Sequence, residues 1–156
     1  MFRPPPVDFI YGIASNWHFN CYSIESVLNE LGIGNLVTGG ILLQIKRAYE
    51  PSSNKDGFRV LIDRLWPRGI KKEKLPLDAW MKELAPSSRL RKEFGHDPNL
   101  WSDFQKKYEK ELRSPEAKER IRHLANKAKR GRVTLVYSAR DEAHNDAVVL
   151  LKIIKR

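Results

Sequence analysis

The sequence has a single cysteine, Cys21, among its 156 residues and no long apolar run. One cysteine cannot form an intramolecular disulfide, and no cysteine cluster is available to hold a metal, so a reducing cytosolic setting is indicated. No run of about 18 apolar residues predicts a transmembrane helix. The four histidines are scattered without metal-ligand spacing, and no P-loop or dinucleotide-binding glycine pattern appears. We therefore expect a soluble, cytoplasmic protein with no membrane association, no predicted metal site and no cofactor that a motif identifies.

Positive charge is abundant and unevenly distributed. The chain contains 29 Lys and Arg residues against 19 Asp and Glu residues, for a net charge of +10. Residues 1–40 contain more acidic than basic side chains, so the positive excess lies entirely in residues 41–156. Such a field attracts anionic partners, including nucleotides, acidic metabolites and nucleic acid, without selecting among them.

The first forty residues differ in kind from the rest. They contain the proline triplet of "MFRPPPVDF" and the glycine-punctuated "LGIGNLVTGG", and only "SIESVLNEL" predicts a short helix. We interpret residues 1–40 as an N-terminal extension that arises from a fusion or from a start codon placed too far upstream. Residues 41–156 are predicted to form a single domain.

Strand and helix patterns alternate from residue 41 onward. Apolar runs predict strands at 41–49, 58–66 and 132–138, and continuous apolar strands suit a parallel sheet. Capping residues and apolar stripes predict helices, and the segment 71–87 fits either a helix or a short extended piece. The alternation predicts an α/β fold, a small three-layer Rossmann-like domain with a mostly parallel sheet and helices on both faces. The predicted helices are 88–94, 98–113, 114–131 and a final helix that begins near residue 143.

Polar side chains gather in two loops, each of which follows a predicted strand. The first is "RLWPRG" at 64–69, and the second is "YSARDEAHN" at 137–145, which leads into the final helix. In an open parallel sheet, ligands bind beyond the carboxyl ends of the strands. If the two strands are neighbours, Arg64, Arg68 and Arg140 share a crevice with the N-terminus of the final helix. Guanidinium and backbone N–H groups both bind oxyanions, so the pattern predicts an anion site.

The residues of these loops also have structural interpretations. Trp66 is suited either to stack on a ligand ring or to form a wall of the core. The arginines are suited either to bind an anion or to pair with Asp63, Asp141 or Glu83, and the sequence leaves both interpretations open. His96, beside a predicted helix cap, needs no ligand. The ligand-binding candidates are Arg64, Trp66, Arg68, Gly69, Arg140, Asn145 and His96.

Four residues of the second loop are candidates for chemistry. The helix dipole favours neutral His144, which suits a general base or hydrogen-bond donor, although a lone histidine is more often structural. Ser138 is a candidate nucleophile beside His144, but the G-x-S-x-G elbow is absent. Asp141 is predicted to cap the final helix and to hold the geometry. The catalytic candidates are Ser138, His144, Tyr137 and Asp141.

Four segments resemble, in order, those of the YeaO-like proteins, a branch of the domain-of-unknown-function 488 family. They are "DGFRVLIDRLWPRG", "LDAWMKELAPSSRLRKEFGHDP", "WSDFQKKYEKEL" and "LVYSARDEAHNDAVVL", within about residues 45–151. The resemblance implies a small cytosolic α/β protein and assigns no reaction. It also implies that related branches have a Cys-His-Arg cluster after the last strand. Here Ser138 and His144 stand there without a cysteine, so a thiol mechanism is not expected.

Two classes of function compete. The leading hypothesis is a protein that binds or processes a small phosphate- or carboxylate-bearing ligand at the two loops, and enzymatic activity is left open. The rival is a basic nucleic-acid-binding protein or transcription-associated regulator that uses helices 98–130. Glutamates are interspersed there, so we prefer a solvated helix pair with local ion pairs. A scaffold without a ligand is favoured only if salt bridges close the crevice. The helix cations are Lys106, Lys107, Lys110, Lys118, Arg120, Arg122, Lys127, Lys129 and Arg130.

Overall fold

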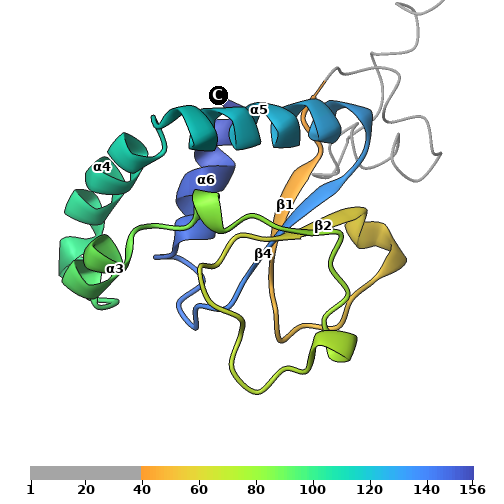
Figure 1. Ribbon diagram of the computed structural model, residues 1–156, viewed down its shortest axis with the longest axis horizontal. Coiled ribbons are helices and arrows are strands. Elements are labelled where there is room, and N and C mark those ends of the chain that lie inside the picture. Colours follow the sequence, from red (N-terminus) through yellow and green to blue (C-terminus); the bar gives the residue numbers. More distant parts are fainter. Residues whose placement is uncertain (1–39) are drawn as a thin grey trace, which may run out of the picture. The chain divides into compact units, whose positions relative to one another are not determined.

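The sheet of this protein consists of four parallel strands in the order β1-β4-β2-β3 (Figure 1). It is seen in a computed structural model that describes residues 40–156, so the helix predicted within residues 1–40 lies outside the described residues. The strands are β1 (Leu43–Arg47), β2 (Phe58–Leu61), β3 (Ala79–Trp80) and β4 (Val133–Tyr137). Leu135 of β4 is paired with Ile45 on one side and with Val60 on the other. The predicted α/β class with a parallel sheet is confirmed.

Local capping signals explain where the helices begin and end. The α-helices are α3 (Ser88–Phe94), α4 (Trp101–Glu111), α5 (Pro115–Arg130) and α6 (Asp146–Lys155). The hydroxyl of Ser87 accepts the N–H of Leu90 at the start of α3, and Gly95 ends this helix in a left-handed conformation. Ser114 caps α5 in the same way. The helix predicted from residue 98 begins as a 3-10 turn over Pro98–Leu100 and becomes α-helical only at Trp101.

All four α-helices contribute to one hydrophobic cluster that covers one face of the sheet. Side chains alternate between the two faces along each strand. Val60 and Leu135 therefore point to the face with the helices, whereas Leu61 and Val136 point to the other. The helices bury Leu90, Tyr108, Leu124 and Leu150 against it.

The opposite face differs from the predicted arrangement with helices on both sides. A second, smaller cluster lies there, in which Leu61 and Val136 pack with Leu75, Trp66 and Trp80. Leu75 and Trp66 belong to the connection between β2 and β3, which forms no α-helix and contains one short 3-10 turn over Lys72–Lys74. Two prolines within the connection, Pro67 and Pro76, oppose a regular helix. The third layer is therefore a folded loop.

Polar side chains fill the rest of this second face. Thr134 of β4 is fully buried, and its hydroxyl donates to the carbonyl of Asp56 at 2.6 Å. Asp56 and Arg59 form a buried ion pair, and Lys46 of β1 reaches the same carboxylate at 3.0 Å. Gly57 follows with φ 63°, and a Cβ there would lie 2.1 Å from the carbonyl oxygen of Arg132, so only glycine fits.

No helix within residues 40–156 is both long and apolar enough to cross a membrane.

Candidate functional site

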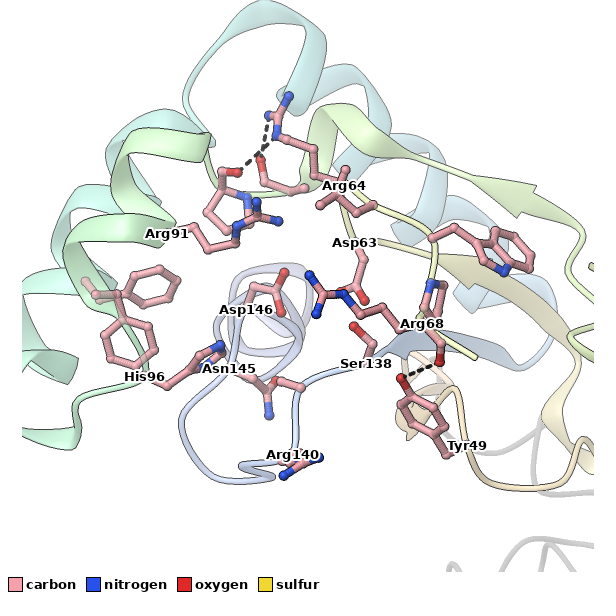
Figure 2. A pocket seen from close by; sticks show the side chains of 18 residues that line it. Tyr49, Asp63, Arg64, Arg68, Arg91, His96, Ser138, Arg140, Asn145 and Asp146 are labelled. Carbon is pink, nitrogen blue, oxygen red and sulfur yellow. Dashed lines mark hydrogen bonds between the residues drawn. The ribbon is translucent and has the colours of Figure 1, made fainter. Parts of the chain in front are cut away.

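A pocket of about 530 Å³ lies at the carboxyl ends of β2 and β4 (Figure 2). The two strands are neighbours, as the crevice hypothesis requires. The loop after β2 forms one wall with Asp63 to Arg68, and the loop after β4 forms another with Ser138 to Arg140. Helix α3 and the start of α6 complete the walls. The two polar loops singled out in the sequence therefore do meet at one cavity.

Four arginines line this pocket in different ways. Arg64 is half-buried, and its guanidinium donates to the carbonyls of Ala85 and Pro86 at 3.3 and 3.2 Å. Arg64 therefore stabilises the wall of the pocket through these two contacts. Arg68 and Arg91 direct their guanidinium groups toward the centre of the pocket, whereas Arg140 lies at the rim (Figure 2).

None of these four arginines forms an ion pair with any residue in the range 40–156. The alternative interpretation, in which the loop arginines pair with Asp63, Asp141 or Glu83, is therefore not what the structure shows. Glu83 instead lies 4.0 Å from Arg120, and Asp141 pairs with His144. No salt bridge among residues 40–156 closes the crevice, so the described part of the chain does not meet the condition that favours a scaffold.

Two carboxyl groups, those of Asp63 and Asp146, face the same cavity. Burial raises the pKa of Asp63, and the neighbouring Ser138 and the charge of Arg91 oppose that rise. Burial and the charge of Asp63 raise the pKa of Asp146 to about 7. One oxygen of the Asp63 carboxyl is buried and has no hydrogen-bond partner in the described chain. The pocket thus pairs cationic groups with carboxyls that hold protons more readily than usual.

The turn before α6 corrects one prediction. Asn145 rather than Asp141 caps this helix, since its side-chain oxygen accepts the N–H of Val148 at 3.1 Å. Asp141 instead accepts the N–H groups of Ala143 and His144, and its other oxygen lies 2.8 Å from Nδ1 of His144. These hydrogen bonds lower the pKa of Asp141. The extra turn explains why the helix begins at Asp146, later than predicted.

The structure brings together only some of the predicted site residues. His144 packs edge-on against Trp101 and does not line the pocket, so it is not placed as a base for Ser138. Tyr137 is buried in the main hydrophobic cluster, and Gly69 lines a different cavity. Trp66 donates to the carbonyl of Ile70 and packs against Trp80. The predicted residues that line the pocket are Arg64, Trp66, Arg68, His96, Ser138, Arg140 and Asn145.

Comparison with known proteins places this architecture in a family. A family model described as "Inactive DUF488-N3 subclade" matches residues 42–156, well over half of the chain. The chain belongs to the DUF488 family. It is 45% identical over 108 residues to the uncharacterized protein YeaO of Escherichia coli strain K12, a match that covers 69% of this chain and 92% of that protein. The predicted family is therefore confirmed.

Mycobacterial relatives are more distant. The DUF488 chain is 36% identical over 112 residues to the uncharacterized protein Mb3100c of Mycobacterium bovis, which covers 72% of this chain and 92% of the relative. The uncharacterized protein Rv3073c of Mycobacterium tuberculosis matches to the same extent. No solved structure matches.

Three charged residues of the DUF488 pocket are not among the predicted site residues. The sequence offers Asp63 as an ion-pair partner, and the apolar run that precedes it signals that it leaves a strand. Asp146 is the first residue of α6, a position that the predicted cap at Asp141 conceals. Arg91 comes from α3, and nothing in its sequence context distinguishes it from Arg89, which is exposed on the same helix.

The cationic helices of the DUF488 domain carry local ion pairs. Lys107 lies 2.9 Å from Glu93, which Arg89 also contacts, and Arg156 lies 3.6 Å from Glu109. No cluster of three or more metal-ligating side chains occurs in the part of the chain that the structure describes. Each ion pair that these helices form in the described chain joins a residue of 98–130 to one outside it, so the interpretation of these helices as a solvated pair with ion pairs of their own stays a prediction.

Proposed function

We propose that this DUF488 chain binds a small anionic ligand, one that bears a phosphate or carboxylate group, in the pocket at the carboxyl ends of β2 and β4. One observation carries the proposal. Arg68 and Arg91, from elements far apart in the sequence, both direct guanidinium groups into the same cavity and form no ion pair within residues 40–156. Forked guanidinium groups recognise phosphate and carboxylate oxygens with two parallel hydrogen bonds.

The charge balance of the pocket supports an anion. The pocket is lined by four arginines and by the two carboxyl groups of Asp63 and Asp146, so positively charged side chains outnumber negatively charged ones. Because the pKa of Asp146 is about 7, this carboxyl is partly neutral near neutral pH, which reduces repulsion of the ligand. Asn145 and the N-terminus of α6 lie at the same wall, and the positive end of a helix favours negative charge.

The carboxyl groups suggest further features of the ligand. The oxygen of Asp63 that has no partner in the described chain accepts a hydrogen bond, and a protonated Asp146 donates one. A ligand with hydroxyl or amino groups beside its anionic group satisfies both. A sugar phosphate or a hydroxy acid has this combination.

Binding rather than catalysis is the better account of the site. The subclade is described as inactive. Ser138 lines the pocket, whereas His144 packs against Trp101 and is not among the lining residues. A serine nucleophile requires a base within hydrogen-bond reach, and no hydrogen bond joins Ser138 to His144 within residues 40–156.

A thermal-shift screen of the full chain tests this proposal. Nucleotides, sugar phosphates, carboxylic acids and short DNA and RNA are compared at low and moderate salt, since a ligand that binds the folded state raises the melting temperature. We expect one class of small anion to stabilise the protein at both salt concentrations. The Arg68→Ala variant should lose this shift, and Lys129→Ala, a change at an exposed residue at the end of α5, should keep it.

Two results would count against the proposal. One is a small-anion shift of the same size in Arg68→Ala as in the unchanged protein. The other is a shift with DNA or RNA alone that vanishes at moderate salt and is reduced in Lys129→Ala, because counterion release makes such binding strongly salt-dependent.

A further inference from the structure

A second pocket, of about 570 Å³, lies on the sheet face opposite the α-helices. It is an open hollow that is lined by the loop 48–52 that follows β1 and by the segment 69–76 between β2 and β3. Arg59 of β2 lines it from the sheet, and Lys71 and Lys74 line it from the segment. The pocket shares only Tyr49 with the first one, and it has no arginine in common with it.

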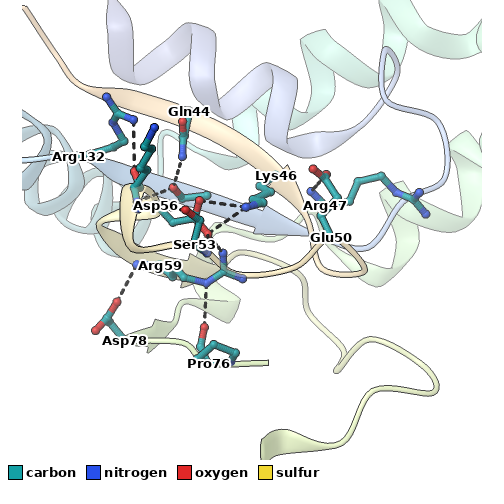
Figure 3. Close-up of polar contacts among 12 residues, drawn as sticks. Gln44, Lys46, Arg47, Glu50, Ser53, Asp56, Arg59, Pro76, Asp78 and Arg132 are labelled. Carbon is teal, nitrogen blue, oxygen red and sulfur yellow. Dashed lines mark hydrogen bonds and ion pairs between the residues drawn. The ribbon is translucent and has the colours of Figure 1, made fainter. Parts of the chain in front are cut away.

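The guanidinium of Arg59 is held in place but incompletely satisfied (Figure 3). Arg59 is 5% exposed, its Nε donates to the carbonyl of Pro76 at 2.9 Å, and one terminal nitrogen pairs with Asp56. Its other terminal nitrogen is buried and has no hydrogen-bond partner within residues 40–156. Buried polar groups in folded proteins are nearly always hydrogen-bonded, so an unused guanidinium nitrogen beside a cavity indicates a missing partner.

Two carboxylates lie beside Arg59, and neither binds its free terminal nitrogen. Asp56 is shared between Arg59 and Lys46, so one carboxylate serves two buried or half-buried cations. Burial opposes ionisation of Asp56, but the N–H of Ser53 and the two cations outweigh it and lower its pKa. Asp78 accepts the backbone N–H of Arg59 at 2.7 Å. The guanidinium therefore keeps one positively charged nitrogen without a direct partner in the described chain.

Other side chains of the pocket increase this positive charge. Lys71 and Lys74 are exposed at its edge. Glu50 is the one acidic residue among the described lining residues, and its carboxylate accepts the backbone N–H of Arg47 at 2.8 Å. Three cations therefore line one open hollow, Arg59 from the sheet and the two lysines from the segment 69–76.

We propose that this second pocket is a phosphate site. A phosphate group seated between the sheet and the segment 69–76 accepts hydrogen bonds from the free nitrogen of Arg59 and from the ammonium groups of Lys71 and Lys74. Three cations that converge on one cavity suit a dianion with several oxygens better than a singly charged carboxylate. The site does not depend on the ligand proposed for the first pocket, because it uses different cations.

A titration followed by NMR tests the second site. Inorganic phosphate is added to the ¹⁵N-labelled full chain at constant ionic strength, and acetate is added in a parallel series. We expect saturable shifts of the Gly69, Ile70 and Lys71 amides and of the Arg59 side-chain Nε–H. Acetate should bind at least fivefold more weakly than phosphate.

Variants at the edge of the pocket supply the controls without disturbing buried Arg59. Lys71→Ala combined with Lys74→Ala should weaken phosphate binding at these signals at least fivefold. Lys72→Ala, in the same 3-10 turn but outside the lining, should leave the affinity unchanged, and so should Arg68→Ala in the first pocket. Shifts that do not saturate, acetate that binds as tightly as phosphate, or equal affinity in the double variant would each overturn the proposal.

Discussion

The hydroxyl of Tyr49 donates a hydrogen bond to the carbonyl of Arg68 across 3.1 Å. It ties the loop after β1 to the loop after β2, and Tyr49 lines both pockets at that point. The contact is exposed, so it adds little to the free energy of unfolding, but it restrains the loop that presents the Arg68 guanidinium. Ordering a binding loop before the ligand arrives increases affinity.

Removing this hydroxyl tests the restraint. In Tyr49→Phe we expect the affinity of the first pocket for its anion to fall roughly threefold to tenfold, the effect of about one hydrogen bond. The unfolding midpoint in urea should change little, because Tyr49 is 49% exposed. Calorimetric titration and urea denaturation of the same sample separate the two effects. Unchanged affinity would show that the loop is ordered without Tyr49.

Protonation of Asp146 predicts a pH-dependent affinity. With a pKa of about 7, this carboxyl is mostly neutral at pH 6 and mostly charged at pH 8. The added negative charge repels the ligand, so affinity for a carboxylate that does not itself titrate in this range should fall several-fold from pH 6 to pH 8. Calorimetry at both pH values measures this change. Asp146→Asn should remove the pH dependence, and a dependence that persists in that variant would assign it to another group.

The same carboxyl predicts an effect on stability. Because folding raises the pKa of Asp146 from an ordinary carboxyl value to about 7, the folded state binds the proton more tightly. The tighter proton binding adds most to the free energy of unfolding below the pKa that Asp146 has in the unfolded state. This contribution decreases as pH rises and is lost above pH 7. Asp146→Asn should therefore stabilise the protein by on the order of 4 kcal/mol at pH 8, from about three pKa units, and by less at pH 5. Urea denaturation at the two pH values measures the difference, and an equal effect at both would contradict the assignment.

The ion pair between Asp56 and Arg59 should be important for folding. Asp56→Ala leaves the guanidinium buried without its carboxylate, and loss of one partner of a buried pair costs about 3–5 kcal/mol. The variant should show a much lower unfolding midpoint in urea. Glu93→Ala, which removes an exposed carboxylate with two cationic neighbours, is the matched control and should change little. Similar midpoints for the two variants would mean that water replaces Asp56.

Much of the secondary structure could be predicted because its signals are local. Ser87 and Gly95 mark the ends of α3, and Ser114 followed by Pro115 marks the start of α5. The segment 71–87 could not be resolved in this way. Its apolar residues have the spacing of a helix, but Leu77 and Trp80 pack in the smaller cluster whereas Met81 and Leu84 pack in the main one, a division that no sequence signal reveals.

The candidate site was predictable in part for the same reason. Ser138 follows β4 directly and Arg68 lies in the loop after β2, and parallel strands place the loops that follow them at one edge of the sheet. Arg91 and Arg59 could not be found, because their roles depend on which elements pack beside them. A buried arginine in a strand has the same sequence signal as an exposed one until its partner Asp56 is known.

Alanine variants of two arginines in α3 provide the most direct test of the proposed anion site. Arg91 directs its guanidinium into the first pocket, whereas Arg89, two residues earlier, is exposed and paired with Glu93. The two alanine variants make the same chemical change in the same helix. Calorimetric titration with the small anion that stabilises the unchanged protein should show at least a tenfold loss of affinity in Arg91→Ala and no change in Arg89→Ala. Equal affinities in the two variants would contradict an anion site in this pocket.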